Sequence, residues 1–188
     1  MEHTMKMQKR RRREGKTDYI KRTKLLKSNT PRIDYRKTNN YIIAQYIKSD
    51  KAQDKIELGA TSKELLKYGW PKESKGSLKS IPASYLLGVL FGNRILKNKF
   101  ETPIIDTGLH RAVHKSRLYA FIKGLVDAGV GIKHEKNTFP DDERIKGKNI
   151  KEIPFEKIKL GIENKPFEKV SKPEHANKPL KKIQKNRK

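Results

Sequence analysis

Alternating polar and apolar residues predict a β-hairpin in the first quarter of the chain. Residues 32–37 alternate along their length, residues 38–40 include two asparagines that suit a turn, and residues 41–47 return as a second strand. Because the second strand is apolar on both faces, we expect it to lie at the centre of a sheet, covered on both sides. Similar patterns predict a third strand at residues 55–61 and a short buried strand at residues 103–106.

Two longer segments repeat their apolar residues at helical spacing. The first begins at Ser80, a residue type that can cap a helix, and runs to about residue 98. The second begins at Ser116 and ends at Gly129, as is typical of a glycine that follows a helix. We therefore predict an α/β fold, with a single mixed sheet covered by these two main helices.

Two glycines, Gly88 and Gly92, lie four positions apart in the first long helix. In a membrane this spacing would favour helix dimerisation. Here we expect the simpler explanation, which is that the missing side chains allow the helix to approach the sheet closely.

Weaker patterns predict four shorter elements. Thr17 or Asp18 can cap a short helix that runs through residue 26, and residues 61–64 are typical of a helix start. Residues 130–133 predict a last short strand, and residues 141–145 a small helix.

Composition divides the chain into three parts. Residues 1–30 form a basic arm with a short helix, and we expect the first 15 residues to be disordered in isolation, since a block of like charge has nothing to pack against. Residues 31–146 contain most of the apolar residues and predict the α/β core domain. Residues 147–188 are rich in Lys, Pro and Asn and predict an extended basic tail that becomes ordered only against a partner.

Positive charge dominates the composition. Lys and Arg total 46 against 21 acidic residues, so the formal net charge is +25 in 188 residues. Such a charge indicates a polyanionic partner, RNA or DNA. No apolar run approaches the roughly 18–20 residues of a spanning helix, so we expect no membrane partner. The chain has no cysteine, which suits a reducing cytoplasm.

The densest charge lies at residues 9–13, and it continues into the predicted hairpin with tyrosines between the cations. A nuclear-localisation run or a solvated disordered end would also explain the cluster itself. The continuation favours an RNA-binding arm, in which cations meet phosphates and tyrosines stack on unpaired bases. Residues 15–17 resemble the end of a nucleotide-binding loop, but Arg10 stands where that loop needs a glycine.

A second basic segment follows the predicted strand at residues 103–106. His110 and His114 could share a metal only with further ligands, and the surrounding cations resist one. We therefore expect a second RNA contact here, with local structural hydrogen bonding as the alternative, and we expect neither a metal nor a cofactor.

Acidic residues are too few for hydrolytic chemistry on nucleic acid. Metal-dependent cleavage needs several clustered carboxylates, and the candidates are only Asp34, Asp106 and Asp127. We expect no enzyme, and we keep a nucleic-acid-processing enzyme and a DNA-binding architectural protein as alternatives.

Trp70 can be either a core residue or a stacking platform, and we favour the core.

The residues expected to bind RNA are cations and aromatic side chains of the arm, the hairpin and the second basic segment. They are Lys9, Arg10, Arg11, Arg12, Arg13, Lys16, Tyr19, Arg22, Lys24, Arg32, Arg36, Lys37, Tyr41, His110, Arg111, Lys115 and Arg117.

Several stretches, in order and spacing over roughly residues 9–150, resemble one family. They include Arg10-Arg11-Arg12-Arg13-Glu14-Gly15-Lys16-Thr17-Asp18-Tyr19, Arg36-Lys37-Thr38-Asn39, Lys67-Tyr68-Gly69-Trp70, Thr107-Gly108-Leu109-His110-Arg111, Asp127-Ala128-Gly129 and Phe139-Pro140-Asp141-Asp142-Glu143-Arg144-Ile145. Together they resemble the large-ribosomal-subunit protein L-eighteen family in its archaeal form, whose longer eukaryotic counterpart is called L-five.

The resemblance implies a non-enzymatic α/β protein that binds 5S rRNA in the central protuberance of the large subunit. It implies contacts with the large-subunit rRNA and with neighbouring ribosomal proteins. It adds Asn39 to the RNA-binding residues expected above. One departure is Lys115, because the family usually has a glycine just before the Ser116-Arg117 pair.

Overall fold

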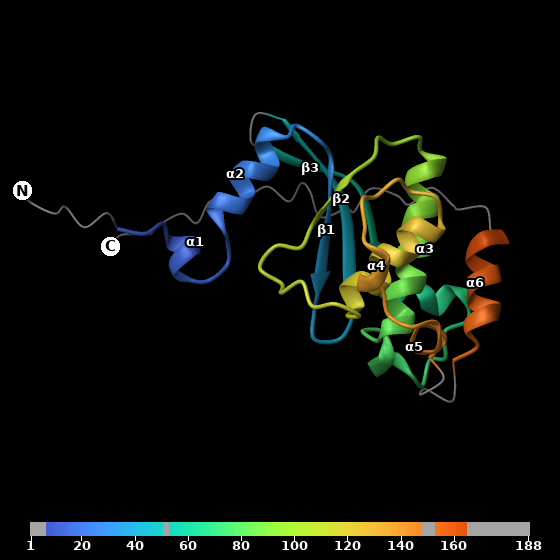
Figure 1. Cartoon of the computed structure of the whole chain (residues 1–188). Coiled ribbons are helices and arrows are strands. Elements are labelled where there is room, and N and C mark those ends of the chain that lie inside the picture. Colours follow the sequence, from blue (N-terminus) through green and yellow to red (C-terminus); the bar gives the residue numbers. More distant parts are fainter. Residues whose placement is uncertain (1–6, 51–52, 148–152, 165–188) are drawn as a thin grey trace, which may run out of the picture.

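Our structure is a computed structural model that describes residues 7–50, 53–147 and 153–164 (Figure 1). Its centre is a four-stranded sheet in the order β3-β2-β1-β4. The strands are β1 (Arg32–Lys37), β2 (Ile42–Asp50), β3 (Gln53–Thr61) and β4 (Ile104–Asp106). The first three are antiparallel and β4 runs parallel to β1, so the predicted mixed sheet is confirmed.

The two faces of the sheet differ in character. Ile33 and Tyr35 of β1 are buried against the helices, together with their cross-strand partners Tyr46 and Ala44. The alternate residues point to the opposite face, where the partly exposed Gln45 of β2 lies. The prediction that β2 lies at the centre of the sheet is confirmed, since β3 and β1 flank it. The prediction that both its faces are covered holds only in part, because the two main helices cover one face and, on the other, Ile47 is buried while Gln45 is partly exposed. β4 is an edge strand rather than a buried one.

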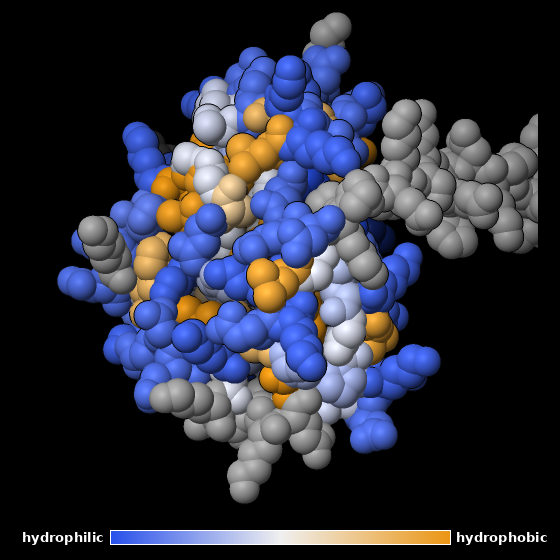
Figure 2. All heavy atoms as spheres, turned by 90° about the vertical axis from the view of Figure 1, so that its right-hand side faces the viewer, coloured by the Kyte–Doolittle hydropathy of each residue, from blue (hydrophilic) through white to orange (hydrophobic). Residues whose placement is uncertain are grey.

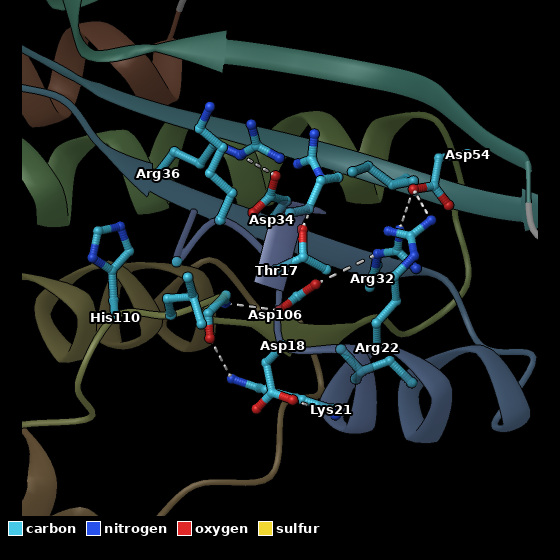
Figure 3. A pocket seen from close by; sticks show the side chains of 17 residues that line it. Thr17, Asp18, Lys21, Arg22, Arg32, Asp34, Arg36, Asp54, Asp106 and His110 are labelled. Atoms are coloured by element: carbon cyan, nitrogen blue, oxygen red, sulfur yellow. Dashed lines mark hydrogen bonds and ion pairs between the residues drawn. The ribbon is translucent and has the colours of Figure 1, made fainter. Parts of the chain in front are cut away.

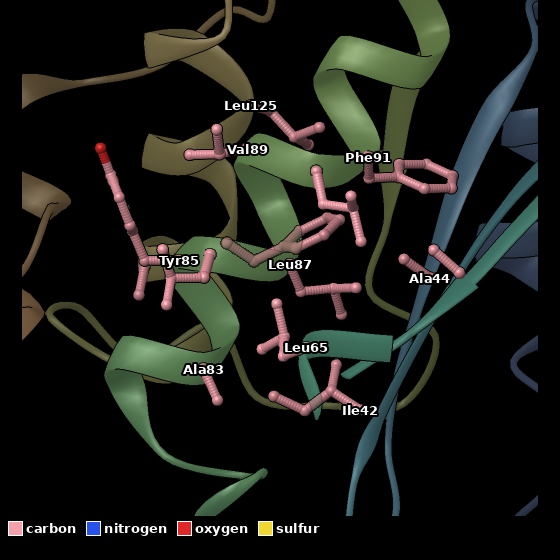
Figure 4. Packing of buried hydrophobic residues seen from close by; sticks show 14 of the residues in the cluster. Ile42, Ala44, Leu65, Ala83, Tyr85, Leu87, Val89, Phe91 and Leu125 are labelled. Atoms are coloured by element: carbon pink, nitrogen blue, oxygen red, sulfur yellow. The ribbon is translucent and has the colours of Figure 1, made fainter. Parts of the chain in front are cut away.

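The two main helices are α3 (Ile81–Lys97) and α4 (Arg117–Asp127), and they cover the inner face as predicted (Figure 1). The Ser80 side chain accepts a hydrogen bond from the Ala83 backbone N–H at 3.4 Å and so caps α3. α4 ends at Asp127, and Gly129, two residues later, has a φ of +99° that suits a glycine. Their apolar side chains pack against the sheet to form the core (Figure 4).

The glycines of α3 face α4 and not the sheet, which corrects the sequence-based expectation. A Cβ atom on Gly88 would lie 2.3 Å from the Phe121 carbonyl oxygen, and one on Gly124 would lie 2.3 Å from the Tyr85 carbonyl oxygen. A Cβ atom on Gly92 would also meet α4's end. The small residues therefore set the distance between the two helices.

Shorter elements follow the predictions in part. Asp18 caps α2 (Tyr19–Lys27), accepting hydrogen bonds from two backbone N–H groups, and α5 (Asp142–Lys146) is the expected small helix. The predicted helix start at residues 61–64 opens a 3₁₀ helix, η1 (Ser62–Tyr68). Residues 130–133 form no strand, so that prediction is wrong. None of the helices in the described ranges combines the length and apolar character needed to cross a membrane.

Two terminal segments are more ordered than the composition predicts. Residues 10–13, expected to be disordered, form the one-turn helix α1 (Arg10–Arg13). Residues 155–164, expected to belong to an extended tail, form α6 (Phe155–Asn164), which packs on α3 and η1 and buries Ile158 and Ile162. The extended-tail prediction is therefore wrong for α6, and its remaining part, residues 165–188, lies outside the described residues.

Trp70 is a core residue, as favoured. Only 2% of its surface is exposed, and its indole N–H donates to the Ser74 carbonyl oxygen.

On the face of the molecule that carries α6, apolar patches are scattered among hydrophilic side chains (Figure 2).

Candidate nucleic-acid interface

A cleft of about 490 Å³ lies on the outer face of the sheet (Figure 3). The arm and α2 form one wall, the loop after β4 forms the other, and β1 contributes the floor. Six of the predicted RNA-binding residues line the cleft: Arg11, Lys16, Arg22, Arg32, Arg36 and His110. The fold thus brings the two basic segments of the sequence to opposite sides of one site.

Arg32 lies at the floor of the cleft, where other residues of the protein bind its guanidinium group. Its side chain is only 6% exposed, and its Nη2 lies 2.7 Å from Asp54 Oδ2. Its Nη1 donates to Ser49 Oγ at 3.1 Å, and its Nε lies 3.6 Å from Asp106 Oδ2. Arg32 is one of the residues predicted to bind RNA, and the structure also gives its side chain a role in joining β1 to residues of the other three strands.

Asp54 connects the sheet to α2. Its Oδ2 accepts from Arg22 Nη2 at 2.9 Å as well as from Arg32, and its Oδ1 accepts from Ser49 Oγ at 2.9 Å. Burial alone would raise the pKa of Asp54, but the hydrogen bonds from Arg22, Ser49 and Arg32 outweigh it and leave that pKa below its ordinary value. Asp54 is therefore a charged carboxylate at neutral pH.

Asp34 and Arg36 form the other ion pair of the outer face. Arg36 Nε lies 2.6 Å from Asp34 Oδ2, and the Arg36 side chain is 67% exposed while that of Asp34 is 9% exposed. Burial raises the pKa of Asp34, and the nearby Arg36 opposes this effect. The carboxylate lies inside and the cation outside, so the cleft presents positive charge to a ligand.

A second connection joins α2 to the opposite wall. Lys21 Nζ donates to Thr107 Oγ1 at 2.5 Å and to the Gly108 carbonyl oxygen at 3.1 Å. The Gly108 N–H in turn donates to Asp106 Oδ1 at 2.8 Å, which fixes the start of the loop. Lys21 and Asp54 are not among the predicted site residues, because nothing in the local sequence distinguishes them from other surface charges. Lys21 meets Thr107 and Gly108, and Asp54 meets Arg22 and Arg32, all more than twenty residues away along the chain.

The arm is folded back on itself before it reaches α2. Arg11 Nε donates to Thr17 Oγ1 at 2.9 Å, and Gly15 makes the turn with a φ of +60°. Lys9 Nζ lies 4.5 Å from the centre of the Tyr19 ring. The arm's arginine side chains remain exposed, so they are available to phosphates.

The remaining predicted residues lie outside the cleft. Exposed cations or polar residues of this group are Lys9, Arg10, Arg12, Arg13, Lys24, Lys37, Asn39, Arg111 and Lys115. Tyr19 and Tyr41 are half-buried, and Lys63 Nζ lies 4.1 Å above the Tyr41 ring. Arg117 is also half-buried and donates to the Lys79 carbonyl oxygen.

Lys115 has a backbone conformation that explains the glycine expected at its position. Its φ is +55°, in the left-handed region that glycine adopts most easily. Its N–H donates to the Thr138 carbonyl oxygen at 2.8 Å, and its Nζ lies 3.1 Å from Asp141 Oδ1. The chain therefore keeps the turn without the glycine.

The chemistry of this surface is that of binding. Within the described part of the chain, no group of three or more His, Asp and Glu side chains could hold a metal ion. The carboxylates of Asp34 and Asp54 are paired with arginines, and cations outnumber acids among the exposed charged groups that line the cleft. Fold and site together define a class: a small α/β protein whose outer sheet face and arm are arranged to bind a polyanion.

Comparison with known proteins identifies the family. A family model described as "Ribosomal large subunit proteins 60S L5, and 50S L18" matches residues 3–103. "Large ribosomal subunit protein uL18" of Korarchaeum cryptofilum is 46% identical over 145 residues, which cover 77% of this chain and 72% of that protein. The protein of the same name from Methanospirillum hungatei is 46% identical over 143 residues, covering 76% and 79%. The chain belongs to this family of large-subunit ribosomal proteins, which are structural and not enzymes.

Proposed function

We propose that this structural ribosomal protein binds 5S rRNA and helps to anchor it in the central protuberance of the large subunit. Its other partners are the large-subunit rRNA and neighbouring ribosomal proteins, and it works in the cytoplasm with the ribosome. The family membership supports the ribosomal role, and the outer sheet face supports the choice of RNA as the direct ligand.

The observation that carries the proposal is the placement of exposed cations around the cleft. Arg11 and Lys16 come from the arm, Arg36 from the sheet, and Arg111 from the loop after β4. Among the described residues, ion pairs join Lys16 to Glu14 and Arg36 to Asp34, and both Arg22 and Arg32 to Asp54. None of these pairs includes Arg11 or Arg111, so the cations of this surface outnumber the acids that they meet. An RNA backbone supplies the missing negative charge.

Specificity would come from the shape of the RNA and from unpaired bases. A folded RNA displays its phosphates in a fixed pattern, and a cleft lined by cations of the arm, α2 and the sheet favours one such pattern over others. Half-buried Tyr19, whose ring lies beside Lys9, and exposed His110, which lines the cleft, offer flat rings on which an unpaired base can stack.

The test is a binding titration of the purified protein with 5S rRNA from its own organism, over a salt series and with tRNA as competitor. We expect tight binding that survives an excess of tRNA, with an affinity that falls as salt rises. Displacement by tRNA at equal concentration would overturn the assignment to 5S rRNA. Stronger binding to duplex DNA than to structured RNA would favour the architectural alternative.

A further inference from the structure

α2 lies against the rest of the protein with little hydrophobic anchoring. None of its nine residues, all of which the structure describes, is fully buried, and its apolar contribution is the half-buried pair Leu25 and Leu26. Helices are normally oriented by the apolar face that they bury, and that face is small in α2. Polar contacts therefore contribute strongly to its orientation and to the direction of the arm that precedes it.

Two adjacent residues of α2 make these contacts, one with the opposite wall of the cleft and one with the sheet. Lys21 bonds to Thr107 and Gly108 of the loop after β4, and Arg22 bonds to Asp54 at the start of β3. Asp54 differs from the other contacts because it also holds the buried Arg32. One carboxylate thus fixes α2 to the strand that forms the floor (Figure 3).

We propose that Asp54 is a specificity-determining positioning residue of the RNA-binding surface. It holds Arg22 in place, so that the cations of α2 and the arm face a folded RNA in one arrangement. It does not touch the RNA itself. This inference rests on the proposed function, because it concerns how the same surface distinguishes 5S rRNA from other RNA.

Charge alone would predict a different effect of removing Asp54 on RNA binding. A carboxylate inside a basic cleft repels phosphate, so its removal should strengthen binding to every RNA. A positioning role instead predicts weaker binding, and only to 5S rRNA. Without Asp54 the arm keeps its charge and loses its fixed direction, so binding to tRNA is kept or strengthened while binding to 5S rRNA is weakened.

The test compares Asp54→Asn with the control Glu57→Gln. Glu57 lies on the same strand, its side chain is 29% exposed against 27% for Asp54, and its partner is Lys55 instead of a residue of α2. Both variants remove one negative charge and so raise the net charge by one. We expect Asp54→Asn to reduce the 5S affinity about tenfold with tRNA affinity unchanged or higher, and Glu57→Gln to leave the preference for 5S rRNA intact.

A second variant removes the concern that Asp54→Asn disturbs the fold by leaving Arg32 unpaired. Arg22→Lys keeps the charge and the Arg32–Asp54 pair, and removes only the guanidinium that reaches Asp54. Its control is Arg144→Lys, an equivalent change at an exposed residue of α5 that is not among the predicted RNA-binding residues. We expect Arg22→Lys to lose 5S affinity several-fold with an unchanged melting curve, and Arg144→Lys to lose little.

The outcomes separate this inference from the proposed function. If wild-type protein shows no preference for 5S rRNA over tRNA, the proposed function fails and the inference with it. If wild-type protein shows the preference, and both Asp54→Asn and Arg22→Lys retain it, the positioning role is refuted while the proposed function stands. Equal loss of affinity for both RNAs would likewise refute positioning, because it would indicate a general phosphate contact.

Discussion

The two main helices approach each other closely at a place where neither has a side chain. Gly88 of α3 and Gly124 of α4 face each other, and a Cβ atom on either would meet a carbonyl oxygen of the other helix. Backbone atoms cannot give way as the end of a flexible side chain can. The distance between α3 and α4, and hence the fit of both to the sheet, depends on these two glycines.

Gly88→Ala tests this dependence. We expect it to lower the free energy of unfolding by about 1–3 kcal/mol, because the added methyl group forces the helices apart, and a urea titration would measure the loss. Gly76→Ala is the matched control, since a Cβ atom there meets nothing within 4 Å. If the two variants unfold at the same urea concentration, the helices are not held by this contact.

Single residues also show where sequence reasoning stops. The spacing of Gly88 and Gly92 correctly indicated a close approach, but the pattern does not say which element approaches, because the partner lies more than thirty residues away. Arg32 resembles its neighbours in sequence as one more cation of the hairpin. Only the folded chain reveals that Asp54 and Asp106 surround it, so its burial could not be predicted from local charge.

At the scale of elements, strong periodicity was a good guide and short apolar runs were not. The long helix α3 and the first hairpin have patterns that only one structure satisfies. Residues 130–133 have too few positions to distinguish a strand from a buried loop, and they form no strand. In α6, apolar residues repeat at helical spacing between lysines. The lysine-rich composition of the segment therefore predicts a tail although the spacing fits a helix.

Ile158→Ala tests whether α6 belongs to the folded core. Ile158 has no exposed surface, and its truncation leaves a cavity between α6 and the rest of the core. We expect the free energy of unfolding to fall by about 2–5 kcal/mol, measured by thermal or denaturant unfolding. Leu160→Ala, on the same helix but with 54% of its surface exposed, should change stability by less than about 0.5 kcal/mol. Equal effects would indicate that α6 does not pack on α3.

At the scale of the whole molecule, the sequence predicts that the protein binds a polyanion but not how the binding surface is built. A net charge of +25 requires such a partner, and the clustering of cations at the N-terminus locates part of the site. The cleft itself depends on contacts between distant segments, such as Lys21 with Thr107. No local pattern encodes that pair, so the second wall of the site could be named as basic but not placed beside the first.

The arm's contribution to binding should appear in the dependence of affinity on salt. Each phosphate contact releases counterions, so the slope of log affinity against log salt reports the number of contacts. Replacing Arg12 and Arg13, both exposed in α1, by alanine should make the slope for 5S rRNA shallower by about 1.4–1.8. Alanine favours helix, so α1 should persist.

The matched control is Lys72→Ala with Lys75→Ala, which removes the same charge between η1 and α3, far along the chain from the arm. An equal change of slope in that control would mean that the charge acts over the whole surface, and an unchanged slope in the arm variant would mean that α1 does not contact phosphate.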